Sequence, residues 1–78
     1  MALIRSMTLK QGEGRIHPTQ VDAHIRVFGG ADGSEIIQID TFGSDDRQIA
    51  VKISQTIQLN RTAAEQLFEV LRKTYGFR

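Results

Sequence analysis

Residues 21–42 read VDAHIRVFGGADGSEIIQIDTF, and this stretch decides the fold. From Val21 to Phe28, apolar and polar side chains alternate with the period of a β-strand that buries one face. A second alternating run extends from Glu35 to Phe42. Asp32-Gly33 lies between the two runs, and Asp-Gly between apolar segments is a strong hairpin-turn signal. The stretch therefore predicts an antiparallel hairpin.

Two further alternating segments flank this hairpin. Leu3–Lys10 alternates imperfectly because Arg5 interrupts it, and it predicts an edge strand. In Arg47–Leu59, the odd positions from Ile49 onward are apolar except for Gln55. Because a strand of that length twists strongly in a small sheet, we expect a bend near Ser54-Gln55.

The last part of the chain predicts a helix. Asn60 is one candidate for its N-cap, and Thr62 with Glu65 forms a second candidate, a capping box. Gly76 is expected to end the helix in the left-handed conformation. Apolar residues recur at helical spacing and form one stripe: Ala64, Leu67, Phe68, Leu71 and Tyr75.

These segments predict one α+β domain over residues 1–78, a four-stranded antiparallel sheet followed by one C-terminal amphipathic helix. The helix is expected to cover one face of the sheet and leave the other for water or a partner. Chains below roughly 80 residues often need a disulfide, a metal or oligomerisation to be stable. Since this chain of 78 residues has no cysteine, we expect a homodimer.

Composition excludes several classes of protein. Ten Lys and Arg residues against nine Asp and Glu residues give a net charge of +1, which argues against a polycation for duplex DNA and against charge-driven disorder. Arg5 interrupts the apolar start of the chain, so no signal peptide is expected. With no apolar run long enough for a membrane span, we expect a cytoplasmic protein.

The sequence predicts no enzyme, no metal site and no cofactor. His17 and His24 lack the spacing of a metal-binding helix, and Asp45-Asp46 lacks the ligand pattern of a calcium loop. Ser44 is not part of a nucleophile elbow. The glycine-rich turn Gly29–Gly33 has no lysine of a phosphate-binding loop.

One face of the predicted sheet is a candidate interface for single-stranded nucleic acid. Cations there would contact phosphates, rings would stack on bases, and polar groups would add hydrogen bonds. The candidate residues are Arg26 and Lys52 for charge, Phe28 and Phe42 for stacking, and His24, Ser54 and Gln58 for polar contacts. Asp22 and Asp40 fall on the same face and would repel phosphates, so a half-polar dimer face is an equal alternative.

The segment Ser54–Asn60, followed by Ala64, Leu67 and Leu71, resembles the strand-to-helix junction of the positive-cofactor-four family. The predicted order of four antiparallel strands and one helix is similar too. Members are small homodimers that bind single-stranded DNA on curved sheets and act in transcription, so the resemblance implies these properties here. The family commonly has a lysine and a glycine where this chain has Ser54-Gln55-Thr56. Residues 40–48 also resemble small bacterial proteins of unassigned role.

The sequence leaves open DNA, RNA or a protein as the partner. A protein-interaction module would use the same sheet face or the edge strand Leu3–Lys10, because exposed strand edges can pair with a partner strand. The salt dependence of binding distinguishes these hypotheses, since nucleic-acid binding weakens steeply as salt rises and strand addition does not. A third hypothesis is an interface that serves only self-assembly.

Overall fold

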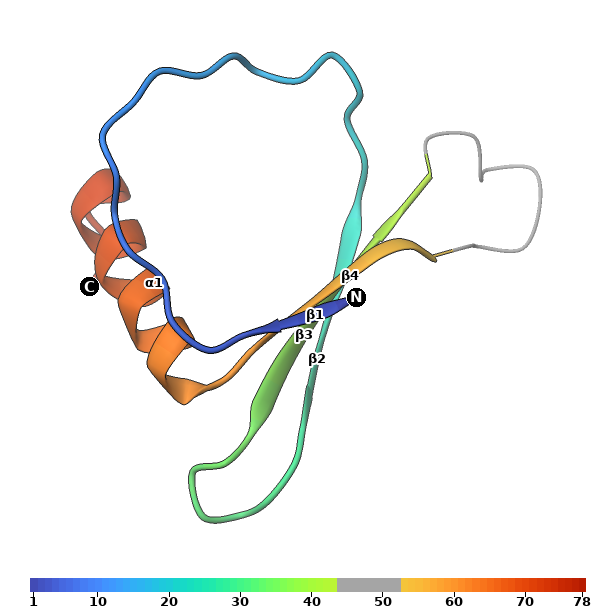
Figure 1. The fold of residues 1–78 in the computed structure, drawn as a ribbon, viewed down its shortest axis with the longest axis vertical. Coiled ribbons are helices and arrows are strands. Elements are labelled where there is room, and N and C mark those ends of the chain that lie inside the picture. Colours follow the sequence, from blue (N-terminus) through green and yellow to red (C-terminus); the bar gives the residue numbers. More distant parts are fainter. Residues whose placement is uncertain (44–52) are drawn as a thin grey trace.

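The computed structural model describes residues 1–43 and 53–78. Its elements, shown in Figure 1, are β1 (Ala2–Ile4), β2 (Ala23–Phe28), β3 (Ile36–Phe42), β4 (Ile53–Leu59) and α1 (Arg61–Tyr75). The α+β class, the four-stranded sheet and the C-terminal helix are thus confirmed. Residues 44–46, which include Ser44 and Asp45-Asp46, and residues 47–52 of the predicted last strand lie outside the described residues.

The sheet is mixed, so the prediction of a wholly antiparallel sheet is wrong. The strand order is β1-β4-β3-β2, with β2–β3 and β3–β4 antiparallel and β1 parallel to β4. The predicted edge strand Leu3–Lys10 does lie at an edge, but it is regular only over Ala2–Ile4.

The connection between β1 and β2 explains the parallel pairing. Strands that run in the same direction need a crossover of about a dozen residues or more, and residues 5–22 supply it. This segment arches over the side of the sheet where α1 lies and runs beside the helix before it reaches β2 (Figure 1). Alternation in the sequence predicts strands but not their order or direction, so it did not reveal this parallel pairing.

The hairpin of β2 and β3 has the predicted register. Ile25 pairs with Ile39 and Val27 with Ile37, so the apolar residues of both strands share one face. Gly29 opens the turn with φ 122°, in the region that favours glycine. A Cβ atom at Gly29 would lie 3.1 Å from the carbonyl oxygen of Ser34, so a side chain there would push this backbone away in addition to straining its own.

The pairing of β3 with β4 is irregular where the sequence predicts a bend. Thr41 pairs with Gln55 and Phe42 with Ile53, which leaves Ser54 as an extra residue on β4. Such an insertion moves the following side chains to the opposite face. Ile53 therefore lies on the side of Phe42, and the prediction that it joins the other odd-numbered apolar residues of this strand is wrong.

Asn60 and Gly76 cap the helix. The Asn60 side-chain oxygen accepts the N–H of Ala63 at 2.9 Å, and the N–H of Gly76, at φ 75°, donates to the Arg72 carbonyl at 2.8 Å. The alternative capping box of Thr62 and Glu65 is wrong, because Thr62 is inside the helix and the Glu65 carboxylate pairs with Arg61 at 2.9 Å.

The helix does not cover the sheet, and this prediction is also wrong. Among the described residues, the buried apolar side chains are Leu59 and Ala63, at the junction of β4 and α1. Asn60 alone separates β4 from α1, so the helix continues from the end of the sheet and meets it mainly at β4 (Figure 1). Phe68 and Tyr75 of the predicted apolar stripe are exposed.

Within the described ranges, no helix combines the length and apolar character needed to cross a membrane.

Candidate nucleic-acid interface

The strand register gathers polar and aromatic side chains on one side of the sheet. His24 pairs with Asp40 and Arg26 with Gln38, and Gln38 in turn pairs with Gln58. Directly paired residues point to the same side. We call this side the polar face. Its polar and aromatic members are His24, Arg26, Phe28, Gln38, Asp40, Phe42, Thr56 and Gln58, and the aliphatic residues Leu3, Ile36 and Ile53 lie on the same side.

Asp40 lies at the centre of the polar face and has no solvent-exposed surface. The Thr56 hydroxyl donates to Asp40 Oδ1 at 2.8 Å. The Gln38 amide donates to Oδ1 at 3.1 Å and to Oδ2 at 3.3 Å, and Arg26 Nη2 lies 3.0 Å from Oδ2. Neighbouring side chains on three strands therefore satisfy a carboxylate on an otherwise open sheet.

These partners stabilise the charged form of the carboxylate. The hydrogen bond from Thr56 is the largest cause that lowers the pKa of Asp40 below its ordinary value, and Gln38 and Arg26 act in the same direction. Burial acts in the opposite direction and is outweighed. Asp40 is thus a fixed anion at neutral pH.

Asp40 also orients the cation of the polar face. The Arg26 side chain remains 59% exposed while its guanidinium bonds to Asp40. A guanidinium has five N–H donors, so an arginine held by one carboxylate keeps donors for a second acceptor. Beside it, the Gln58 amide donates to Gln38 Oε1 at 2.9 Å, which orders the neighbouring amides.

The aromatic side chains of the polar face differ in their contacts and exposure. The rings of His24 and Phe42 make an edge-to-face contact with centroids 4.5 Å apart and an interplanar angle of 71°. Phe28, at the end of β2, is 46% exposed. Phe28 therefore presents a more accessible ring than Phe42, which is half-buried.

The structure brings together five of the seven sequence-predicted site residues: His24, Arg26, Phe28, Phe42 and Gln58. Ser54 is the extra residue of the irregular pairing and stands outside the ladder. Lys52 lies outside the described residues. Of the two cations that the sequence predicts for this site, the structure therefore describes Arg26.

Sequence reasoning missed the partnership of Asp40 with Arg26, Gln38 and Thr56. It placed Asp40 on this face only as a group that repels phosphate. The predicted hairpin could have revealed this contact. Residues that are equally far from Asp32 in the sequence pair with each other, as Arg26 and Gln38 do. That spacing places Asp40 diagonally next to Arg26, within reach of a long side chain.

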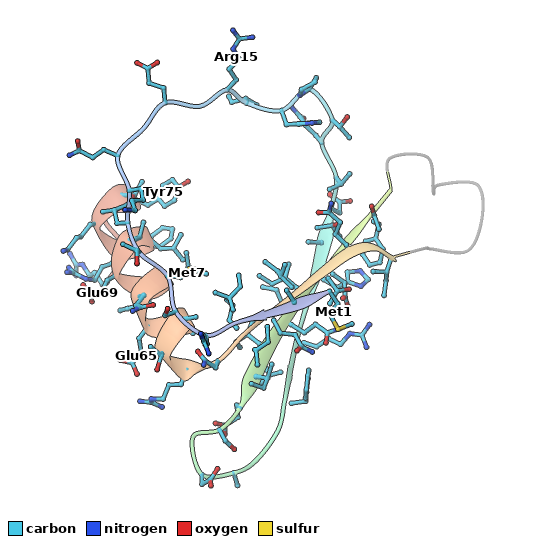
Figure 2. The ribbon with its side chains drawn as sticks, viewed as in Figure 1. Met1, Met7, Arg15, Glu65, Glu69 and Tyr75 are labelled. Atoms are coloured by element: carbon cyan, nitrogen blue, oxygen red, sulfur yellow. The ribbon has the colours of Figure 1, made fainter. Side chains whose placement is uncertain are left out.

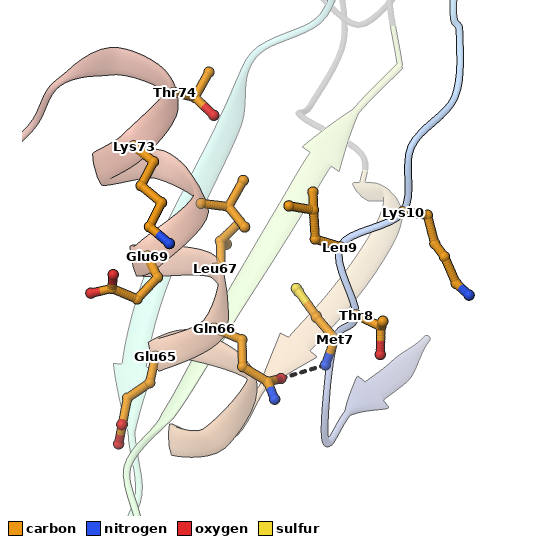
Figure 3. Close-up of a pocket in the computed structure, with 11 residues that line it drawn as sticks. Met7, Thr8, Leu9, Lys10, Glu65, Gln66, Leu67, Glu69, Lys73 and Thr74 are labelled. Carbon is orange, nitrogen blue, oxygen red and sulfur yellow. Dashed lines mark hydrogen bonds between the residues drawn. The ribbon is translucent and has the colours of Figure 1, made fainter.

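A second surface feature is a groove between the connecting segment and the helix (Figure 3). Its volume is about 680 Å³, and its apolar lining includes Met7, Leu9, Leu67 and Val70. Figure 3 shows the Met7 N–H donating to the Gln66 side-chain oxygen across it. Its lining carries charged groups of both signs, Lys10 and Lys73 with Glu65 and Glu69, and they define no preferred charge for a ligand.

The described residues contain no group of three His, Asp or Glu side chains placed to hold a metal ion. His17 instead makes a local contact, in which its Nδ1 accepts the N–H of Thr19 at 3.0 Å.

No family model, curated protein or solved structure is significantly similar to this chain. The resemblance to the positive-cofactor-four family therefore remains a prediction from sequence. Its topological part is weakened, because it relied on four antiparallel strands and β1 is parallel to β4.

Proposed function

We propose that this protein binds single-stranded nucleic acid on the polar face, without making or breaking bonds, and that it acts as a homodimer. The observation that carries the proposal is the placement of Arg26 beside the exposed ring of Phe28 on one face of the sheet, with the guanidinium oriented by Asp40. The resemblance described above would extend this function to transcription.

Each group has a role that follows from its chemistry. The free donors of Arg26 would contact a phosphate, and the Phe28 ring would stack on a base. His24 and Gln58 would offer hydrogen bonds to base edges or sugars. Because stacking tolerates every base, the proposed site has little sequence preference.

The charge of Asp40 limits the expected affinity. It offsets most of the charge of Arg26 at a distance of 3.0 Å, so the polar face as described carries little net positive charge. Stacking must then supply a large share of the binding free energy, at ~1–3 kcal/mol per base.

Fluorescence anisotropy with a labelled poly-thymidine strand of about 20 nucleotides tests the proposal, since that length spans several stacking sites. We expect binding at low salt that weakens as salt rises. Absence of binding at low salt would overturn the proposal.

A protein-interaction module is the second candidate function. The observation that favours it is β2, which lies at the free edge of the sheet with all six residues exposed. Exposed strand edges can accept a further strand through backbone hydrogen bonds, and that mode needs no cation. Binding that is insensitive to salt would favour this candidate.

A further inference from the structure

The side of the sheet opposite the polar face is wholly apolar over its centre. Ile25 pairs with Ile39, Val27 with Ile37, and Ile39 with Ile57, so their side chains point the same way. We call this side the apolar face. Its members are Ala2, Ile4, Ala23, Ile25, Val27, Ile37, Ile39, Thr41, Gln55, Ile57 and Leu59. None of these side chains is charged, and the two polar ones, Thr41 and Gln55, lie together at one end of the face.

Exposure on the apolar face is lowest next to the helix and highest on the edge strand β2. Leu59, next to the first turn of α1, is 3% exposed, and Ile57 on the same strand is 40% exposed. On β2, Val27 is 62% exposed and Ile25 is 68% exposed. The helix therefore covers only one end of this face, and β-branched side chains that favour a packed sheet surface are left in water.

The whole chain has more surface than a compact protein of its mass. Its accessible surface is 6993 Å², whereas a compact monomer of 8.7 kDa is expected to have about 4,700 Å². Its radius of gyration is 14.7 Å, against about 11.5 Å for a compact domain of this length. The excess of about 2,300 Å² includes the exposed residues 8–22 of the connecting segment as well as the apolar face. It is larger than the ~800 Å² that each partner buries in a standard interface, so it leaves area for such an interface.

From these observations we propose that the apolar face is the contact surface of a homodimer, in which it packs against the apolar face of a second copy. This inference rests on the homodimeric state proposed above and adds which surface forms it. The connecting segment arches over this side without burying the side chains of the apolar face, so the second copy has to enter between the segment and the sheet. Two sheets that pack face to face lie ~10 Å apart and interdigitate their inward side chains. The two polar faces then point outward, and both stay free for ligand.

A second copy fits this surface better than an unrelated protein does. Among the described residues, only Leu59 and Ala63 are buried apolar groups, too few to hold a sheet and a helix together. The partner must therefore be present whenever the chain folds, and a second copy always is. A two-fold contact is also self-complementary, and an uncharged face meets no like charge in its copy.

The absence of cysteine from the sequence allows a direct test. Ile25→Cys places a single thiol on the apolar face, and His24→Cys places one on the polar face of the same strand as a matched control. The mass of each variant is measured by light scattering, and its thiol is then reacted with a maleimide in native buffer and in denaturant. We expect a mass of twice 8.7 kDa, loss of native reactivity for Ile25→Cys, and full reactivity for His24→Cys.

A monomer at micromolar concentration would overturn both the homodimeric state and this inference, but nucleic-acid binding could still be measured. A dimer in which the thiol of Ile25→Cys reacts freely would overturn the assignment of the surface alone.

If Ile25→Cys fails to fold, Ile25→Val keeps the test decisive. It removes one methylene from each copy and is expected to raise the dimer dissociation constant roughly 5- to 100-fold. His24→Gln is the matching control, and an unchanged constant for Ile25→Val would contradict the inference.

Discussion

Arg26 and Asp40 give the polar face its electrostatic character. The guanidinium and the carboxylate lie 3.0 Å apart, with Arg26 59% exposed and Asp40 without exposed surface. A ligand therefore meets the cation first, although the anion behind it reduces the attraction. Removing the charge of Arg26 should therefore weaken binding, whereas removing the charge of Asp40 should strengthen it.

Arg26→Gln should weaken single-stranded DNA binding, because it removes the cation that neutralises a phosphate. The slope of log affinity against log salt should become shallower by about 0.7 for each phosphate that is no longer neutralised.

Asp40→Asn should strengthen binding several-fold, because the charge of Arg26 is no longer offset. Anisotropy titrations at several salt concentrations measure both effects.

Arg61→Gln is the matched control, since Arg61 is also exposed and also pairs with a carboxylate, that of Glu65, at 2.9 Å, but on the helix. If all three variants bind like the wild-type protein, the polar face is not the nucleic-acid interface.

Phe28→Ala should reduce affinity by about 1–3 kcal/mol, the contribution of one stacked base, with an unchanged salt slope. Phe77→Ala is its control, because Phe77 is 56% exposed against 46% for Phe28 but lies beyond the helix. Equal losses in the two variants, measured by anisotropy, would argue against stacking at Phe28.

Asp40 should make the stability of the protein fall in acid. Its native pKa is lower than its unfolded pKa, so its contribution is complete above the unfolded value of about 3.9 and is lost as pH falls through the native value. Asp32 and Glu69 also have lowered pKa values and act in the same direction. Urea unfolding followed by circular dichroism at pH 7 and at lower pH should show this loss, with a smaller loss in Asp40→Asn. An identical pH profile in that variant would contradict the assigned role of Asp40.

At the scale of elements, the junction of β4 and α1 holds the buried apolar side chains of the described residues. Asn60 ends the strand and caps the helix in one residue, and the buried side chains Leu59 and Ala63 stand on either side of it. The long connection from β1 to β2 is different. Its contact with the helix is made near Met7, and Arg15 at its crest points away from the rest of the molecule (Figure 2).

Asn60→Ala should lower the free energy of unfolding by ~1 kcal/mol, because the N–H of Ala63 loses its acceptor. Thr62→Ala should have little effect, since Thr62 is an exposed helix residue and not the cap. Urea unfolding at one fixed protein concentration compares the two variants. A larger effect for Thr62→Ala would restore the capping box that the structure contradicts.

At the scale of the whole molecule, folding and association should be one process. A chain that leaves most of its apolar sheet face in water gains its core only with a partner, so dilution should destabilise it. The urea midpoint should therefore rise with protein concentration across a hundredfold range, followed by circular dichroism. A midpoint that does not move with concentration would show that the single chain is stable by itself.

Local patterns in the sequence determined the elements and the two faces. The alternation in residues 21–42 correctly predicted the hairpin and which of its side chains share a face, because period-two geometry is a property of each strand alone. Asn60 and Gly76 likewise act on backbone groups within a few residues, so their roles could be predicted without any distant contact.

The tertiary structure alone decided which strands are neighbours and what covers them. The parallel pairing of β1 with β4 depends on the path of residues 5–22, and the contact of Asp40 with Thr56 depends on the register of β3 with β4. The uncovered apolar face depends on the direction in which α1 leaves the sheet. These features arise from contacts between segments far apart in the chain, whereas alternation and capping signals report only on the conformation of each segment by itself.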